Sequence, residues 1–137
     1  MMLEKHYSIK ERMKLDPIKN VQDLKNDLLP CFNEGKEFFI GLYLDSGNKV
    51  ICREIIHIGG LNESIVDIRA VFKNAILLNA NSIILAHNHP SGNLTPSQED
   101  INIAEKLNKA GKLLGIPVLD HIIFNHETIQ SYKEELN

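Results

Sequence analysis

Residues 82–100 read SIILAHNHPSGNLTPSQED, and this stretch decides how the rest of the chain is interpreted. It begins with a short apolar segment, residues 82–86, which predicts a buried strand. A polar loop with two histidines follows, and then a helix. For that helix we predict Thr95 as the N-cap, Pro96 at the first helical position and Gln98 as the partner in a capping box. A buried strand that leads through a loop into a helix is typical of an α/β fold.

Working outward from this stretch, the hydrophobic pattern predicts alternating strands and helices. The predicted elements are a helix over residues 20–32, a strand over 38–44, a turn over 45–48, a strand over 50–58, a helix over 67–79 with Asp67 as N-cap, the helix after Thr95 that ends at Gly115, a strand over 116–124 and a short helix over 128–136. Together they predict an α/β sandwich with a mixed sheet. Pro17 separates an N-terminal arm, residues 1–19, from the domain at 20–137.

The length, composition and net charge of the chain fit one ordinary globular domain. The chain has 137 residues, 43% of them hydrophobic, and a formal net charge of −3, which gives no support to a nucleic-acid binder. No apolar run approaches the ~20 residues that span a bilayer, and the charged N-terminus lacks a secretory signal. The two cysteines, Cys31 and Cys52, are far apart and are expected to be reduced. We therefore expect a cytoplasmic protein without a membrane partner. The sequence gives no physical basis for an oligomeric state.

The loop at the end of the predicted strand carries the pattern His87-Asn88-His89-Pro90. Two histidines at positions i and i+2 of an extended chain project to the same side and can share one cation. Pro90 fixes its own φ and favours an extended conformation at His89. The pair also follows a buried strand, where α/β folds open crevices to ligands. These features indicate a metal site.

Asp100 supplies a third ligand. It lies in line with the apolar stripe of the predicted helix, whose members are Ile103, Leu107, Ala110 and Leu114. A carboxylate on a core-facing stripe is costly unless it is paired, and a cation shared with His87 and His89 would remove that cost. Three protein ligands leave one tetrahedral position open, which is the catalytic pattern for zinc. Ser97, three residues before Asp100, can reach the same site. We therefore predict one Zn²⁺ per chain, held by His87, His89 and Asp100.

At this point the sequence resembles a known family. The residues His87-Asn88-His89-Pro90, Ser97 and Asp100 fit the JAMM (MPN-plus) metalloprotease pattern H-x-H-P-x6-S-x-x-D, and the string HNHPSGNLTPSQEDI is similar to the signature of its RadC branch. The resemblance extends from about Val21 to Phe124. It implies a three-layer, cytidine-deaminase-like sandwich with a curved mixed sheet between helices. It also implies a zinc-activated water that hydrolyses peptide or isopeptide bonds, with ubiquitin-like proteins as substrates in other branches.

The resemblance also implies the remaining catalytic residues. The catalytic glutamate of the family sits between the first helix and the first long strand, where this chain has Glu37, so Glu37 is the expected general base. Glu54, on the apolar face of the second strand, is the rival. Ser97 matches the serine proposed to stabilise the oxyanion. Asp120 and His121 fit equally well as partners that orient the metal ligands or as a polar pair at a strand end.

Three alternatives are kept. The RadC branch carries a DNA-repair label, so a nuclease or nucleic-acid-binding protein is one, although the charge does not support it. Two histidines and a carboxylate also bind iron(II) in non-haem iron enzymes. Many MPN relatives are interaction modules without catalysis. Full-length RadC proteins also carry a helical N-terminal domain that this chain is expected to lack.

Overall fold

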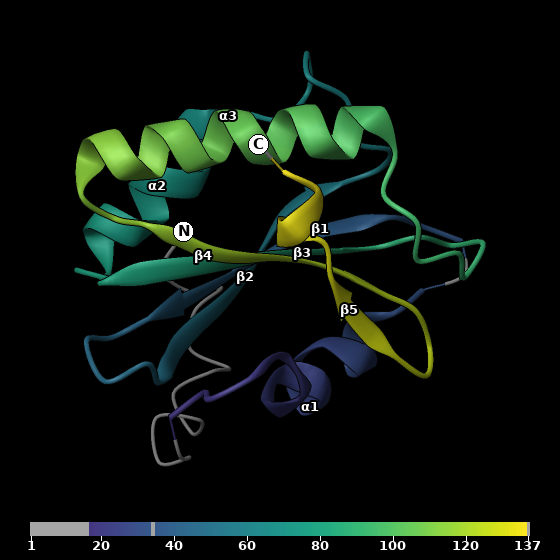
Figure 1. Cartoon of the computed structure of the whole chain (residues 1–137), viewed down its shortest axis with the longest axis horizontal. Helices are drawn as coiled ribbons and strands as arrows, with labels where there is room; N and C mark the ends of the chain where they lie inside the picture. The colour runs from purple at the N-terminus through teal and green to yellow at the C-terminus, as the bar shows by residue number, and fades with distance from the viewer. Residues whose placement is uncertain (1–16, 34, 137) are drawn as a thin grey trace.

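The computed structural model of the chain describes residues 17–33 and 35–136, and its centre is a five-stranded sheet in the order β2-β1-β3-β4-β5 (Figure 1). β3 and β4 run parallel, and every other neighbouring pair is antiparallel, so the sheet is mixed as predicted. The strands are β1 (Phe38–Leu44), β2 (Val50–Ile58), β3 (Ser82–Asn88), β4 (Val118–Phe124) and β5 (Ile129–Ser131). The predicted arm at residues 1–19 falls almost entirely outside the described residues.

Helices lie on both faces of this sheet, which gives the predicted three layers. Figure 1 shows α2 (Ile68–Leu77) and the long α3 (Gln98–Leu114) above the sheet, and α1 (Lys25–Leu28) below it beside β5. Asp67 caps α2 as predicted, since its side chain accepts a hydrogen bond from the N–H of Arg69. Gly115 ends α3 in the left-handed conformation, with φ of 74°.

The β1–β2 hairpin has the predicted bounds, because its signal lies in consecutive residues. β1 pairs with β2 on one side and β3 on the other, and all of its residues after Phe38 are buried. Burial on both faces explains the near-continuous apolar run. The turn contains Asn48 in the left-handed region, with φ of 61°, which asparagine tolerates.

Two predicted helices are wrong in detail. The segment over residues 20–32 is not one regular helix: the short α1 lies between the 3-10 turns η2 (Val21–Leu24) and η3 (Leu29–Cys31), and Pro30, inside η3, cannot continue the helical ladder. Residues 128–136 form β5 followed by the 3-10 turn η4 (Lys133–Glu135). β5 pairs antiparallel with β4, so the ladder overrides any local preference for helix.

The start of α3 differs from the prediction and bears on the site. Ser97, not Thr95, is the N-cap, and Asp100, not Gln98, completes the capping box. The Ser97 hydroxyl accepts a hydrogen bond from the N–H of Asp100 at 3.0 Å, and Asp100 Oδ2 accepts one from the N–H of Ser97 at 2.8 Å. This reciprocal pair satisfies two backbone donors at the helix start.

β3 is two residues longer than predicted, since it includes His87 and Asn88. Both residues are polar and were therefore assigned to the loop, but ladder partners are present for them. His87 pairs with Phe39 of β1 and with Ile123 of β4, and Asn88 pairs with Phe124. His87 thus stands on a rigid central strand and not on a loop.

Gly111 lies where α3 packs closely against α2 and the turn that leads into β4. A Cβ atom there would lie 2.6 Å from the backbone oxygen of Ile116 and 3.4 Å from Phe72. Alanine is favoured over glycine in helices by about 1 kcal/mol. We nevertheless expect Gly111→Ala to lower the free energy of unfolding by about 1–3 kcal/mol, because the backbone contact has no room to relax. Urea denaturation measures this change, with Lys112→Ala on the exposed side of α3 as the control. A Gly111→Ala protein more stable than wild type would contradict the packing described.

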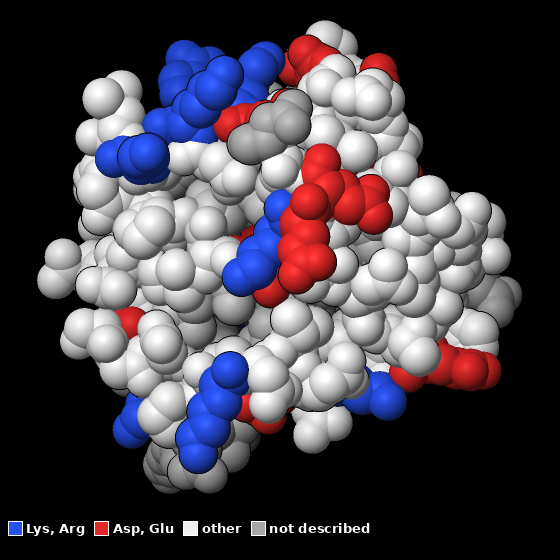
Figure 2. Space-filling model, viewed as in Figure 1, with Lys and Arg blue, Asp and Glu red and all other residues white. Residues whose placement is uncertain are grey.

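Charge is unevenly spread over the face seen in Figure 2. Basic side chains gather over the C-terminal half of α3, which carries the exposed Lys106, Lys109 and Lys112, while acidic side chains surround η4. The basic group therefore lies at the opposite end of α3 from Asp100. Within the described ranges, no helix is long and apolar enough to cross a membrane.

Candidate metal site

Four side chains from three separate stretches of the chain meet at the carboxyl end of β3. Glu37, His87, His89 and Asp100 each offer a ligand atom, and these atoms all lie within 4.8 Å of one another. His87 ends β3 together with Asn88, His89 follows directly, Asp100 lies in the first turn of α3, and Glu37 precedes β1. The structure thus brings the three predicted ligands together with the predicted general base.

The donor atoms of the three predicted ligands form a nearly equilateral triangle. His87 Nε2 lies 3.1 Å from His89 Nε2 and 3.3 Å from Asp100 Oδ2, and His89 Nε2 lies 3.1 Å from Asp100 Oδ2. In a tetrahedral zinc site with bonds of about 2.0–2.2 Å, neighbouring donors are roughly 3.3–3.6 Å apart. The triangle agrees with one face of such a site within a few tenths of an ångström, so the residues fit a zinc ion.

The environment of His89 fixes which of its ring nitrogens faces this triangle. Its Nδ1 lies 2.7 Å from the carbonyl oxygen of Asn93, and a carbonyl only accepts, so Nδ1 carries the proton. With that proton on Nδ1, the Nε2 atom of neutral His89 has a lone pair to offer a cation shared with His87 and Asp100. Gly92, at φ of 85°, makes the tight turn that brings Asn93 back to the ring. A backbone partner of this kind is typical of histidines that bind metals.

His87 is held by packing. Its side chain is 1% exposed, and the ring of Tyr132 packs edge-on against it with centroids 5.9 Å apart. Asp100 is 3% exposed and accepts a hydrogen bond from the N–H of Ser97. Burial raises the pKa of the Asp100 carboxyl, but hydrogen bonding to His87 and His89 outweighs it and holds that pKa well below its usual range. Two imidazole nitrogens and an ionised carboxylate converge on one point, where a cation can take the place of the imidazole protons that hydrogen-bond to Asp100.

Glu37 is half-buried and lies at the edge of this triangle. Burial raises the pKa of its carboxyl group, and the neighbouring His87 and His89 oppose that rise. The rival Glu54 is buried on β2 opposite Gly41 and does not belong to the four-residue group. Between the two glutamates, only Glu37 is placed to act beside the three ligands.

Ser97, Asp120 and His121 take different positions. Ser97 is exposed and joins the site through its reciprocal hydrogen bonds with Asp100. His121 is buried, its Nε2 lies 2.7 Å from Oδ1 of Asn108 on α3, and burial lowers its pKa to about 4. Asp120 accepts hydrogen bonds from Ser131 and from the N–H of His121. Neither Asp120 nor His121 belongs to the four-residue group.

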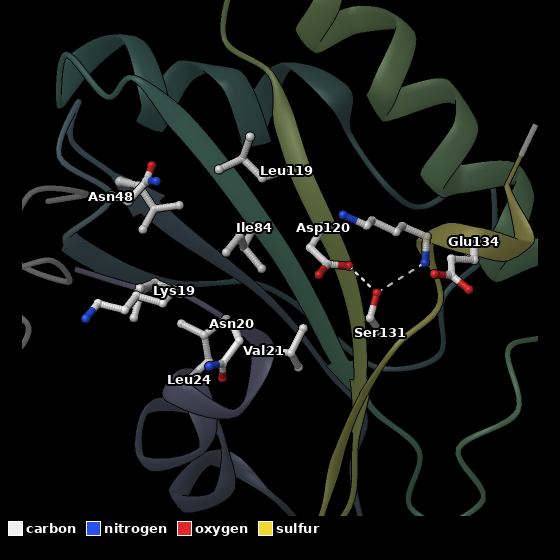
Figure 3. A pocket seen from close by; sticks show the side chains of 13 residues that line it. Lys19, Asn20, Val21, Leu24, Asn48, Ile84, Leu119, Asp120, Ser131 and Glu134 are labelled. Atoms are coloured by element: carbon white, nitrogen blue, oxygen red, sulfur yellow. Dashed lines mark hydrogen bonds between the residues drawn. The ribbon is translucent and has the colours of Figure 1, made fainter. Parts of the chain in front are cut away.

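Two hollows flank the sheet. A cavity of about 430 Å³ lies between the segment that leads into α1 and the strands β4 and β5, and Figure 3 shows Asp120 and Ser131 beside the apolar Val21, Ile84 and Leu119. None of the four grouped residues lines it. A more open hollow of about 650 Å³ is lined by residues 60–65 and Glu99. It adjoins the site, since a Cβ built on Gly60 would lie 3.9 Å from Glu37 Oε2.

Sequence reasoning missed three residues that support the site, namely Asn88, Asn93 and Tyr132. Asn93 acts through its backbone, so its residue type gives no signal. Tyr132 reaches His87 only because β5 and η4 replace the predicted C-terminal helix. Asn88 lies between the two histidines of the motif, and the sequence pattern assigns it no role.

Comparison with known proteins agrees with this geometry. Residues 18–137 match the RadC-like JAB domain family. A UPF0758 protein of Methanosarcina acetivorans is 53% identical over 100 residues, which is 73% of this chain and 44% of that protein. A UPF0758 protein of Methanosarcina mazei is 47% identical over 119 residues, or 86% of this chain and 52% of that protein. A third, from a Geobacillus species, is 49% identical over 100 residues, or 73% of this chain and 44% of its own length. The chain spans about half the length of these relatives.

Proposed function

Since the chain belongs to the RadC-like JAB domain family, we propose that it is a zinc-dependent hydrolase that cleaves an amide bond in a peptide or protein. The observation that carries this proposal is the triangle of donor atoms from His87, His89 and Asp100 with the carboxylate of Glu37 beside it. A zinc ion held there would polarise the substrate carbonyl and lower the pKa of a coordinated water to about 7.

Glu37 is the proposed general base. It takes a proton from the attacking water and returns it to the nitrogen of the scissile amide, so that the C–N bond breaks with a neutral amine as leaving group. Its partly buried position supports this role, because burial raises the pKa of its carboxyl group and so makes the carboxylate a stronger base.

Ser97 is the proposed donor to the substrate oxygen. Its hydroxyl oxygen accepts the N–H of Asp100, which leaves the hydroxyl hydrogen for another acceptor. Ser97 is exposed at the start of α3, beside the ligand Asp100. A hydroxyl at this place can donate to the oxyanion as the carbonyl carbon becomes tetrahedral.

The open hollow next to Gly60 is the proposed approach for substrate. It is lined by the loop of residues 60–65 together with Glu99, and Glu63 of that loop accepts a hydrogen bond from Asn102 of α3. An open hollow that reaches Glu37 suits an extended chain better than a small enclosed ligand. A peptide or the tail of a ubiquitin-like protein is the substrate class that we propose.

Cleavage of a mixed quenched-fluorescent peptide library, together with a panel of ubiquitin-like conjugates, tests the proposed function. We expect cleavage by the zinc-loaded protein, loss of cleavage after a chelator has removed the metal, and recovery when one equivalent of zinc per chain is returned. Restoration by zinc and not by iron(II) separates this proposal from an iron enzyme. A protein that binds zinc at this site and cleaves neither substrate set would contradict the proposed function.

A further inference from the structure

Asn88, between the two histidines, makes three side-chain hydrogen bonds to the backbone of the segment that leads into β1. The backbone ladder between β1 and β3 ends at the pair Phe39 and His87. One residue further on, the fully buried side chain of Asn88 continues it. Its Oδ1 accepts the N–H of Phe38 at 2.6 Å, and its Nδ2 donates to the carbonyl oxygens of Lys36 at 2.9 Å and Asn33 at 3.1 Å.

Two of these bonds hold the peptide groups immediately before and after Glu37. The carbonyl of Lys36 and the N–H of Phe38 are the peptide groups that flank Glu37. The carbonyl of Glu37 itself accepts the N–H of Gly59 at 2.8 Å, which ties the segment to the end of β2. With three consecutive residues anchored, only the side-chain torsions of Glu37 remain to be set.

The alternation of side chains along β3 and the residue after it explains how residues 87–89 contact both the metal site and the segment before β1. Successive side chains of an extended chain point to opposite sides. His87 and His89 therefore face Asp100 on one side, while Asn88 faces the backbone of Asn33, Lys36 and Phe38 on the other. The backbone of residues 87–89 therefore positions both the two histidine ligands and, through Asn88, the segment that carries Glu37. Asn88 and Lys36 are 52 positions apart in sequence.

We infer that Asn88 is the positioning residue that places the Glu37 carboxylate beside the metal ligands. This inference rests on the proposed function, in which Glu37 is the general base. The site requires one acceptor and two donors on a short side chain, which asparagine supplies. Aspartate would set a second acceptor against two carbonyl oxygens, and alanine would leave a buried N–H and two carbonyls without their partner.

Nuclear magnetic resonance of the zinc-titrated protein tests the inference without a substrate. In wild type we expect zinc to shift the histidine ring signals and the side-chain carboxyl carbon of Glu37. In Asn88→Ala we expect the histidine shifts to persist, the Glu37 shift to shrink, and the Phe38 amide to exchange with solvent roughly tenfold faster or more. Asn88→Asp should resemble Asn88→Ala. Asn74→Ala, at another buried asparagine on α2, is the matched control and should behave as wild type.

Turnover of the peptide library adds a second readout. If Asn88 acts through Glu37, Asn88→Ala should lower kcat by about 10–100-fold and leave KM nearly unchanged. In a Glu37→Gln background it should cause no further loss. An unchanged Glu37 signal and an unchanged Phe38 exchange rate in a zinc-binding Asn88→Ala protein would overturn the inference. Failure of zinc to move any histidine signal in wild type would instead count against the proposed function.

Discussion

Replacing Asp100 by alanine is expected to abolish tight zinc binding. Four-ligand zinc sites have apparent binding free energies of about 10–16 kcal/mol, so one ligand accounts for roughly 3 kcal/mol or more. The affinity for zinc should therefore fall by about a hundredfold or more, as measured by competition with a chromophoric chelator. His89→Ala should have a similar effect, because the Nε2 atoms of His89 and His87 and the Oδ2 of Asp100 share one triangle.

Asp100 also completes the capping box of α3, so this experiment needs a control for stability. Removing a capping side chain costs about 1 kcal/mol whether or not a metal is bound. Asp67→Ala removes the N-cap of α2, where Asp67 accepts the N–H of Arg69, and Asp67 is not among the predicted metal ligands. We expect Asp67→Ala to lose similar stability and keep full zinc affinity. Asp100→Ala with the zinc affinity of wild type would remove Asp100 from the ligand set.

Replacing Glu37 by glutamine is expected to stop turnover and spare the metal. Glutamine has the shape of glutamate but cannot accept a proton near neutral pH. General-base catalysis contributes about 10²–10⁴-fold, so kcat on the peptide library should fall by that factor. Zinc affinity should stay close to that of wild type, because the other three residues of the group already provide two histidines and a carboxylate. Both quantities are to be measured on the same preparation.

Two outcomes would change the role of Glu37. If Glu37→Gln weakens zinc binding as strongly as Asp100→Ala does, Glu37 is a fourth ligand and not the base. If Glu54→Gln stops turnover and Glu37→Gln does not, the rival glutamate is the base. The structure favours Glu37, since its carboxylate belongs to the four-residue group and that of Glu54, on β2 opposite Gly41, does not.

Much of the fold could be predicted because its signals are local. The run before Asp45 and the turn after it define both strands of the β1–β2 hairpin, and the structure has them at the predicted residues. The end of α3 at Gly115 was equally clear. The structure of the C-terminal segment could not be predicted, because β5 is a strand only through its pairing with β4. A segment of three residues carries no local pattern that indicates such a partner.

The start of α3 shows why a plausible local pattern can be wrong. Thr95 and Pro96 resemble an N-cap and a first helical residue, and Gln98 completes the predicted box. Ser97 and Asp100 make the box in the structure. Asp100 is buried and forms part of the metal-ligand triangle, so its position fixes which backbone N–H its carboxylate can accept.

Some residues of the candidate site could likewise be predicted from local sequence patterns, and others could not. Spacing alone predicted that His87 and His89 share a cation, and the apolar stripe of α3 predicted that Asp100 faces them. Glu37 came from the family resemblance, because no periodicity relates it to the histidines. Asn88 had no signal at all, since its partners lie about 50 residues earlier in the chain and are backbone groups.

The central claim is that His87, His89 and Asp100 hold one zinc ion. Diffraction from crystals of the zinc-loaded protein, recorded at the zinc absorption edge, tests it most directly. The expected result is a single anomalous peak about 2.0–2.2 Å from Nε2 of both histidines and from Oδ2 of Asp100. A protein crystallised with excess zinc that shows no peak at this position, or one that Asp100 does not contact, would contradict the claim.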